Sequence, residues 1–140
     1  MSLYLDASVL VALFVDDPFT ARARAVLHSA LPALIVSDLA AAEFASAIAR
    51  LVRIGDAKSK AARATFANFD AWLLRESRFA ETSSADVVAA AAFIRRLDLT
   101  LRAPDAIHIA IAQRVGADLF TFDKQMAKSA RSLGTAVGKA

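Results

Sequence analysis

The chain has 140 residues, of which 57% are hydrophobic and 22% charged, with a formal net charge of +3. This length fits one compact domain spanning residues 1–140, and the large apolar fraction excludes a disordered chain. The sequence contains no cysteine, which excludes disulfides, thiolate catalysis and cysteine-ligated zinc.

Short apolar runs separated by longer segments with helical spacing predict alternating strands and helices. The predicted strands are residues 3–5, 34–36, 79–82, 99–101 and 119–122. Strands that alternate with helices favour crossover connections and therefore a parallel sheet. We predict an α/β fold: a three-layer α/β/α domain with a mostly parallel sheet of four to five strands flanked by helices.

Two helices are predicted between the second and third strands. The first begins at a cap formed by Ser37 or Asp38, runs to about Arg53 and is ended by Gly55. The second opens at Asp56, and its apolar residues recur at a spacing typical of one helical face. These residues are Ala62, Phe66, Phe69 and Leu73.

Two further helices are predicted before the last strand. Ser83 or Ser84 caps the first of them, with Asp86 in its first turn. Its apolar residues are expected to face inward: Val87, Val88, Ala91 and Ile94. Pro104 suits the first position of the second helix, whose residues Ile107, Ala110 and Ile111 are expected to be buried.

Acidic residues follow several of the predicted strands. Asp6 directly follows the first strand, Asp123 follows the last, and Asp105 lies in the first turn of the helix after residues 99–101. Sites in parallel α/β sheets form beyond the carboxyl ends of the strands, so these acids can meet there. Glu43 lies in the helix after the second strand. Each acid taken singly also has a structural role open to it, as a helix cap, a partner of a helix N-terminus or a solvated side chain.

Convergence of these carboxylates would require a compensating cation, because like charges repel strongly in a partly buried site. Oxygen ligands without cysteine favour Mg²⁺ or Mn²⁺. Such ions activate water and neutralise the charge of a phosphate. Apart from these four acids, the rest of the chain carries more basic than acidic residues, which suits binding to a nucleic-acid backbone. The pattern thus favours a metal-dependent nuclease.

Motifs in order along almost the whole chain resemble the PIN-domain family, most of all its VapC-type toxins. They are LDAS at residues 5–8, Glu43, APDAIH at residues 103–108, and GADLFTFD at residues 116–123. The resemblance implies a single PIN-like domain with endoribonuclease activity that uses Mg²⁺ or Mn²⁺ and acts on an RNA substrate. It also implies a homodimer, inhibited by a cognate antitoxin whose C-terminal segment lies across the active-site groove.

Matching positions assign the site residues that the resemblance implies. The acidic quartet is Asp6, Glu43, Asp105 and Asp123, and its accompanying hydroxyl residues are Ser8 and Thr121. We expect Asp6 and Asp105 to be the main metal ligands, with Asp123 and Glu43 completing the first shell or orienting waters. One carboxylate would help to deprotonate the water that attacks the phosphorus in line.

Other residues near these motifs have weaker assignments. Basic residues on one helical face beyond the last acid are candidates for contacts to RNA phosphates: Lys124, Lys128 and Arg131. We interpret His108, three residues after Asp105, as a partly buried, hydrogen-bonded core residue. Leu10, Leu13 and Phe14 are interpreted as core, with a dimer or antitoxin groove as the alternative.

Two other functions stay open at this point. One is a catalytically silent PIN scaffold that binds RNA or protein. The other is a phosphoaspartyl phosphatase of the haloacid-dehalogenase type, which needs a second acid two residues after the first, where this chain has Ser8. The uncharged apolar runs at residues 7–15 and 87–94 are far shorter than a membrane span. With no basic leader before Asp6, we expect a cytoplasmic protein with no membrane segment.

Overall fold

A parallel sheet organises the chain in the computed structural model, which describes residues 1–29 and 32–138. The elements in chain order are β1 (Ser2–Leu5), α1 (Ala7–Phe14), α2 (Thr20–Ser29), β2 (Ala33–Ser37), α3 (Asp38–Arg53), α4 (Ser59–Glu76), β3 (Ser77–Ala80), α5 (Ser84–Arg95), α6 (Ala103–Val115), β4 (Asp118–Phe120) and α7 (Lys124–Ser132). None of the helices in these described ranges combines the length and the apolar character that a membrane span requires.

The strand order β3-β2-β1-β4 places β1 beside β4, although these strands lie at opposite ends of the sequence. All pairs are parallel, and Leu5 is in register with Phe120. The next residue, Asp6, donates its backbone N–H to the Phe120 carbonyl at 3.3 Å. The carboxyl ends of β1 and β4 therefore meet at one point, from which Asp6 and Thr121 both emerge.

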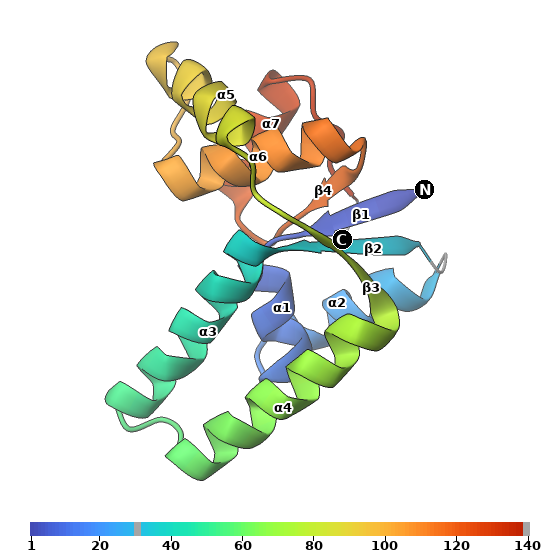
Figure 1. Ribbon diagram of the computed structural model, residues 1–140, viewed down its shortest axis with the longest axis vertical. Helices are drawn as coiled ribbons and strands as arrows, with labels where there is room; N and C mark the ends of the chain where they lie inside the picture. The colour runs from blue at the N-terminus through green and yellow to red at the C-terminus, as the bar shows by residue number, and fades with distance from the viewer. Residues whose placement is uncertain (30–31, 139–140) are drawn as a thin grey trace.

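Helices cover both faces of the sheet, with α1 to α4 on one side and α5 to α7 on the other (Figure 1). Side chains alternate between the two faces of a strand, and β1 follows this rule. Leu3 and Leu5 enter the core under α1, α3 and α4, whereas Tyr4 enters the core under α6 and α7. The expected three-layer α/β/α architecture is confirmed, and the predicted sheet of four to five strands has four, all parallel, in the described residues.

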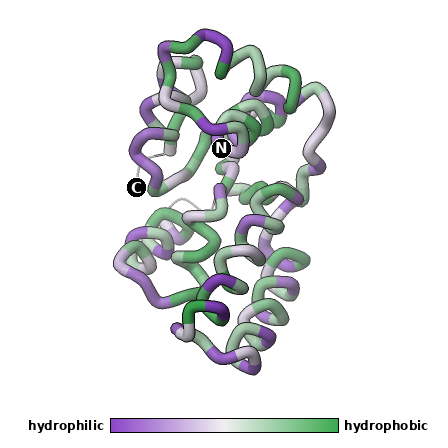
Figure 2. Tube along the Cα trace, turned by 90° about the vertical axis from the view of Figure 1, so that its left-hand side faces the viewer, coloured by the Kyte–Doolittle hydropathy of each residue, from purple (hydrophilic) through white to green (hydrophobic). Residues whose placement is uncertain are grey.

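Amphipathic patterning explains the long helices α3 and α4. Hydrophilic and hydrophobic residues alternate along the helices at the bottom of Figure 2. Phe44 and Ile48 of α3 and Phe69 of α4 are buried in the same core. The predicted cap at Ser37 is confirmed, because its side chain accepts a hydrogen bond from the backbone N–H of Ala40.

Some predicted boundaries and faces are wrong. Residues 99–101 form no strand; they belong to the turn that lets α6 return against α5. That turn begins at Leu97, which adopts φ 66°. Helix α4 begins at Ser59 rather than at Asp56, and its preceding residue provides no side-chain cap.

The face of α5 that contacts the rest of the molecule also differs from the prediction. Val87 and Val88 are exposed at 49% and 70%, and Ala91 is exposed as well. The helix instead buries Asp86 and Ala90. The apolar pattern misled here because the carboxylate of Asp86 is paired with Arg114 of α6, so a charged residue occupies the buried face.

Candidate active site

Asp6 is the most deeply buried acid of the predicted quartet. It ends β1, caps α1, and is only 3% exposed. Its Oδ1 accepts hydrogen bonds from Ser8 Oγ at 2.6 Å and from the Val9 backbone N–H at 3.2 Å. Its Oδ2 accepts a hydrogen bond from Thr121 Oγ1 at 2.5 Å. The structure thus brings Ser8 and Thr121 to Asp6 across the junction of β1 and β4.

Burial raises the pKa of Asp6 above its ordinary value, even though its hydrogen bonds and the nearby His108 lower it. Removing a carboxylate from water disfavours its charged form. Since the hydroxyl donors of Ser8 and Thr121 do not offset that cost, a cation beside Asp6 would stabilise the ionised side chain.

The same hydroxyls join the turn after β1 to the turn after β4. Ser8 Oγ accepts from the Phe122 backbone N–H at 3.0 Å, and Thr121 Oγ1 accepts from the Asp123 backbone N–H at 3.0 Å. Ser8 donates to Asp6 within its own turn and accepts from the turn after β4, whereas Thr121 donates to Asp6 across the junction and accepts within its own turn. Together these hydrogen bonds fix the position of Asp123 relative to Asp6.

Asp123 and Asp105 form a second pair of acids at this edge. Asp123 Oδ1 caps α7 by accepting hydrogen bonds from backbone N–H groups of its first turn. Burial raises the pKa of Asp105, and the negative charge of Asp123 raises it further. Arg102 Nε lies 3.8 Å from Asp105 Oδ2, but the Arg102 side chain is 86% exposed. Solvent screens such a pair, so the repulsion between the two acids persists.

Glu43 is held by His108, a contact that the sequence analysis did not identify. The predicted burial of His108 is confirmed, at 1% exposure. Its Nε2 contacts Glu43 Oε1, and its Nδ1 lies 2.6 Å from the Tyr4 hydroxyl. The Tyr4 hydroxyl in turn lies 2.7 Å from Ser37 Oγ. The three-residue spacing from Asp105 was the available signal, because it places His108 one helical turn beyond that acid.

The chemistry of these donors fits a hard divalent cation, because all of them are carboxylate oxygens. Within residues 1–29 and 32–138, no group of three or more His, Asp or Glu side chains is gathered closely enough to hold a metal ion. Mg²⁺ usually binds through one or two carboxylates and keeps several waters, so a closed cage is not required. His108 connects two of these acids, because its Nε2 contacts Glu43 and it lies one helical turn after Asp105 on α6.

The three basic candidates of α7 do not share one environment. Lys124 and Arg131 line a hollow of about 580 Å³ that also includes Thr121 and Asp123. We call this cavity the Phe19 hollow, after the exposed aromatic residue in its wall. Lys128 instead lines a smaller hollow beside Asp98. The structure therefore brings Lys124 and Arg131 beside Asp123, while Lys128 faces the turn between α5 and α6.

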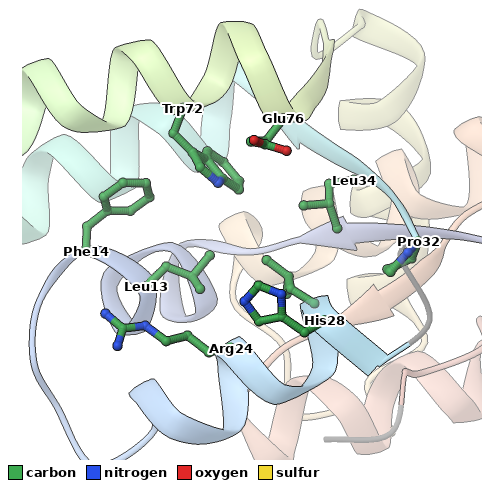
Figure 3. A pocket seen from close by; sticks show the side chains of 9 residues that line it. Leu13, Phe14, Arg24, His28, Pro32, Leu34, Trp72 and Glu76 are labelled. Carbon is green, nitrogen blue, oxygen red and sulfur yellow. The ribbon is translucent and has the colours of Figure 1, made fainter.

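A separate hollow of about 510 Å³ lies between α1, α2, α4 and β2 (Figure 3). We call it the Trp72 hollow. Leu13, Phe14 and Trp72 supply apolar walls, and Arg24 and Glu76 supply charges. No acid of the predicted quartet lines this cavity. Leu10 is fully buried, as predicted for a core residue.

Comparisons with known proteins agree with this architecture. The PIN domain family profile matches residues 3–132. Ribonuclease VapC46 of Mycobacterium tuberculosis is 37% identical over 139 residues, which are 97% of this chain and 95% of the relative. VapC20 of the same organism, a sarcin–ricin loop cleaving toxin, has a TM-score of 0.71 at 21% identity, over 91% of this chain and 94% of that chain.

A toxin–antitoxin complex from Klebsiella pneumoniae includes a chain with a TM-score of 0.60 at 20% identity, over 91% of this chain and 90% of that one. Both solved structures share the fold described above. The family profile and the 37% identical relative carry the assignment itself, because each spans nearly the whole sequence. The chain belongs to the PIN-domain family.

Proposed function

We propose that the chain is a metal-dependent endoribonuclease and the toxin of a toxin–antitoxin pair. The observation that carries this proposal is the buried carboxylate of Asp6, which Ser8 and Thr121 orient beside the turn that holds Asp123. Family membership and the 37% identical ribonuclease support RNA as the substrate.

We assign the cation, Mg²⁺ or Mn²⁺, to the carboxylates of Asp6, Asp105, Asp123 and Glu43. When bound, it supplies charge neutralisation at the phosphate and lowers the pKa of water. The raised pKa values of Asp6 and Asp105 support this assignment, because both carboxylates lie where a positive charge would relieve an unfavourable environment.

The protein's own residues would orient and deprotonate the nucleophile. Ser8 and Thr121 keep the Asp6 carboxylate in one orientation, and His108 does the same for Glu43. One carboxylate of the quartet accepts a proton from the water that attacks the phosphorus in line. Lys124 and Arg131, beside Asp123, hold the RNA backbone by charge.

The test is cleavage of total RNA by the unsubstituted chain and by Asp6→Asn, with Mg²⁺ or Mn²⁺ and with a chelator. We expect mapped cleavage sites only for the unsubstituted chain with metal. The asparagine keeps the shape of the side chain and one oxygen, so folding is checked by thermal unfolding. Retained cleavage by folded Asp6→Asn would remove Asp6 from the mechanism.

The same preparations separate the alternatives. A catalytically silent scaffold would bind RNA without cleaving it under any metal condition. A phosphatase would hydrolyse p-nitrophenyl phosphate and leave RNA intact. Either result would contradict the proposed ribonuclease activity.

We propose that the antitoxin contacts the Trp72 hollow in addition to the active-site groove that the family resemblance implies, because the hollow combines apolar walls with charges of both signs, which suits a protein segment. Leu13→Arg should weaken capture by the cognate antitoxin without reducing RNA cleavage. The matched control is Leu74→Arg, because Leu74 is an exposed residue of α4 that does not line the hollow. Equal capture by both variants would move the partner to another surface. The homodimer stays a prediction, which the molecular mass in solution would test.

A further inference from the structure

An exposed aromatic residue stands in the wall of the Phe19 hollow. Phe19 is 38% exposed, and its ring stacks on that of Phe122, with centroids 4.6 Å apart and planes inclined by 16°. Phe122 in turn meets the fully buried Phe120 edge-on at 5.2 Å. Three aromatic rings therefore connect the core with the hollow, and the outermost ring has open surface.

The backbone around Phe19 is firmly held. Asp17 Oδ1 accepts a hydrogen bond from the Phe19 backbone N–H at 2.7 Å. Asp17 also donates its own backbone N–H to Thr20 Oγ1 at 3.0 Å, and that hydroxyl donates to the Val15 carbonyl. This turn holds the Phe19 backbone immediately before α2 and so sets the direction in which its side chain leaves the chain.

Arg22 lies beside the stacked pair. Its guanidinium carbon is 5.6 Å from the centroid of Phe19 and 5.5 Å from that of Phe122. A guanidinium on the outer face of Phe19 would be much farther from Phe122 than from Phe19. The equal distances therefore place Arg22 at the side of the stack. Since Phe122 covers one face of Phe19, the exposed surface lies on the opposite face.

Positive charge surrounds this aromatic surface. Arg22, Lys124 and Arg131 all line the Phe19 hollow and are exposed, whereas Asp123 is its acid. Single-stranded nucleic acid is bound by this combination, in which bases stack on aromatic rings and cations contact phosphates. The Trp72 hollow differs, because it combines apolar walls with both signs of charge.

We propose that the Phe19 hollow binds one nucleotide of single-stranded RNA next to the scissile phosphate, with its base stacked on Phe19 and its phosphate held by Arg22. This inference rests on the proposed function, because Asp123 connects the hollow with the acids. A double helix would keep its bases stacked inside, so the geometry selects unpaired RNA. Phe19 and Arg22 are thus positioning residues for the substrate.

The test uses an eight-nucleotide single-stranded RNA that carries 2-aminopurine, titrated in a chelator so that binding is separated from cleavage. We expect binding to quench the fluorophore when it occupies the stacked position. Phe19→Leu should bind about tenfold more weakly and lose the quenching, whereas Phe19→Tyr should keep both. Arg22→Gln should lower the slope of log K against log salt by about 0.7, the value of one phosphate contact on a single strand.

Matched controls exist on β3, at the opposite edge of the sheet, where Arg78 and Phe79 are both exposed. Phe79→Leu and Arg78→Gln should bind the RNA like the unsubstituted chain. Arg22→Gln changes only an exposed side chain, so its salt slope decides the matter even if Phe19→Leu fails to fold. An unchanged salt slope, or equal binding by Phe19→Leu and Phe79→Leu, would overturn the inference.

Cleavage by the unsubstituted chain with Mg²⁺ or Mn²⁺ is measured in parallel. If this chain neither binds nor cleaves RNA, the proposed function fails together with this inference. If it binds and cleaves RNA while the Phe19 and Arg22 variants behave as their controls do, only the nucleotide site is wrong. A loss of antitoxin capture by Phe19→Leu, with RNA binding intact, would show a protein surface instead and also overturn the inference.

Discussion

The hydroxyl of Tyr4 in β1 lies 2.6 Å from Nδ1 of His108 in α6. The opposite ring nitrogen, Nε2, contacts Glu43, so the imidazole joins the Tyr4 hydroxyl to the Glu43 carboxylate. The Tyr4 hydroxyl is also hydrogen-bonded to Ser37 Oγ, which accepts from the N–H of Ala40. These hydrogen bonds link the orientation of Glu43 to the core.

Tyr4→Phe should therefore reduce both stability and activity. The substitution removes the hydroxyl to which both Ser37 Oγ and His108 Nδ1 are hydrogen-bonded, and losing a partner in a buried site costs about 1–3 kcal/mol. The imidazole that holds Glu43 also loses its anchor. Urea unfolding measures the first effect, and the rate of RNA cleavage with Mg²⁺ measures the second. Full activity in a destabilised variant would show that this hydrogen-bonded chain is structural only.

We expect the buried Asp86 carboxylate to contribute folding stability that is lost in acid. Burial alone would raise its pKa, but hydrogen bonds from Arg114 and Ser83 and the charge of Arg114 hold the pKa below its ordinary value. The bonds to Arg114 measure 2.8 and 2.9 Å. A lowered pKa contributes stability that is present above the unfolded value, about 3.9, and is lost as the pH falls through the folded value.

Asp86→Asn should accordingly destabilise the chain by about 2–3 kcal/mol near neutral pH, and its loss of stability below about pH 4 should be shallower. Urea unfolding at a series of pH values measures both effects. Asp70 on α4 is exposed, so Asp70→Asn is the control. Parallel curves for Asp86→Asn and the unsubstituted chain would contradict the role of the Arg114 pair.

Removing the charge of Asp105 should affect thermal stability in opposite ways with and without metal. Because Asp123 and burial both disfavour its charge, Asp105→Asn should raise the thermal midpoint slightly in a chelator. Added Mg²⁺ or Mn²⁺ should stabilise the unsubstituted chain, since a ligand of the folded state adds stability, but should stabilise Asp105→Asn much less. Thermal unfolding of both chains, in a chelator and during a metal titration, measures these changes in the midpoint. Equal stabilisation of both chains would place the cation away from Asp105.

The sequence alone predicted positions correctly where a local signal, such as the end of a strand or a helix cap, coincides with the tertiary arrangement. Asp6 directly follows β1, and Asp123 follows the predicted last strand, so the rule for the carboxyl ends of parallel strands located these two acids. Thr121 was predicted inside that strand, and only the family resemblance assigned it to the site. Capping chemistry located the start of α3 at Ser37. The resemblance to the PIN-domain family then supplied Glu43, which helical spacing alone left on a solvated face.

Contacts between distant elements could not be predicted in this way. Glu43 meets His108 and Asp86 meets Arg114 only because α6 packs against α3 and α5. The apolar valines of α5 favoured the wrong face, since periodicity does not record that a charge can be buried with a partner. The stacking of Phe19 on Phe122 likewise joins segments whose spacing in the sequence carries no signal.

Thr121 allows the junction of β1 and β4 to be tested without changing its shape. It is 7% exposed, donates to Asp6 and accepts from the Asp123 backbone N–H. Thr121→Val keeps the volume but removes both hydrogen bonds. Hydrogen bonds to a charged group contribute about 1.5–3 kcal/mol, so stability should fall by about that amount in a chelator.

Activity should fall in Thr121→Val for a separate reason: both Asp6 and Asp123 lose a common anchor, so the carboxylates no longer keep their relative positions. The partly exposed Thr65 of α4 also donates to a backbone carbonyl. Thr65→Val is the matched control, expected to change stability by less than about 0.5 kcal/mol. Ser8→Ala removes the reciprocal hydroxyl and should reduce cleavage in the same way. If Thr121→Val lost stability but cleaved RNA at the unsubstituted rate, the hydroxyl would serve the fold alone, and the orientation of Asp6 would have to come from Ser8 and the N-terminus of α1.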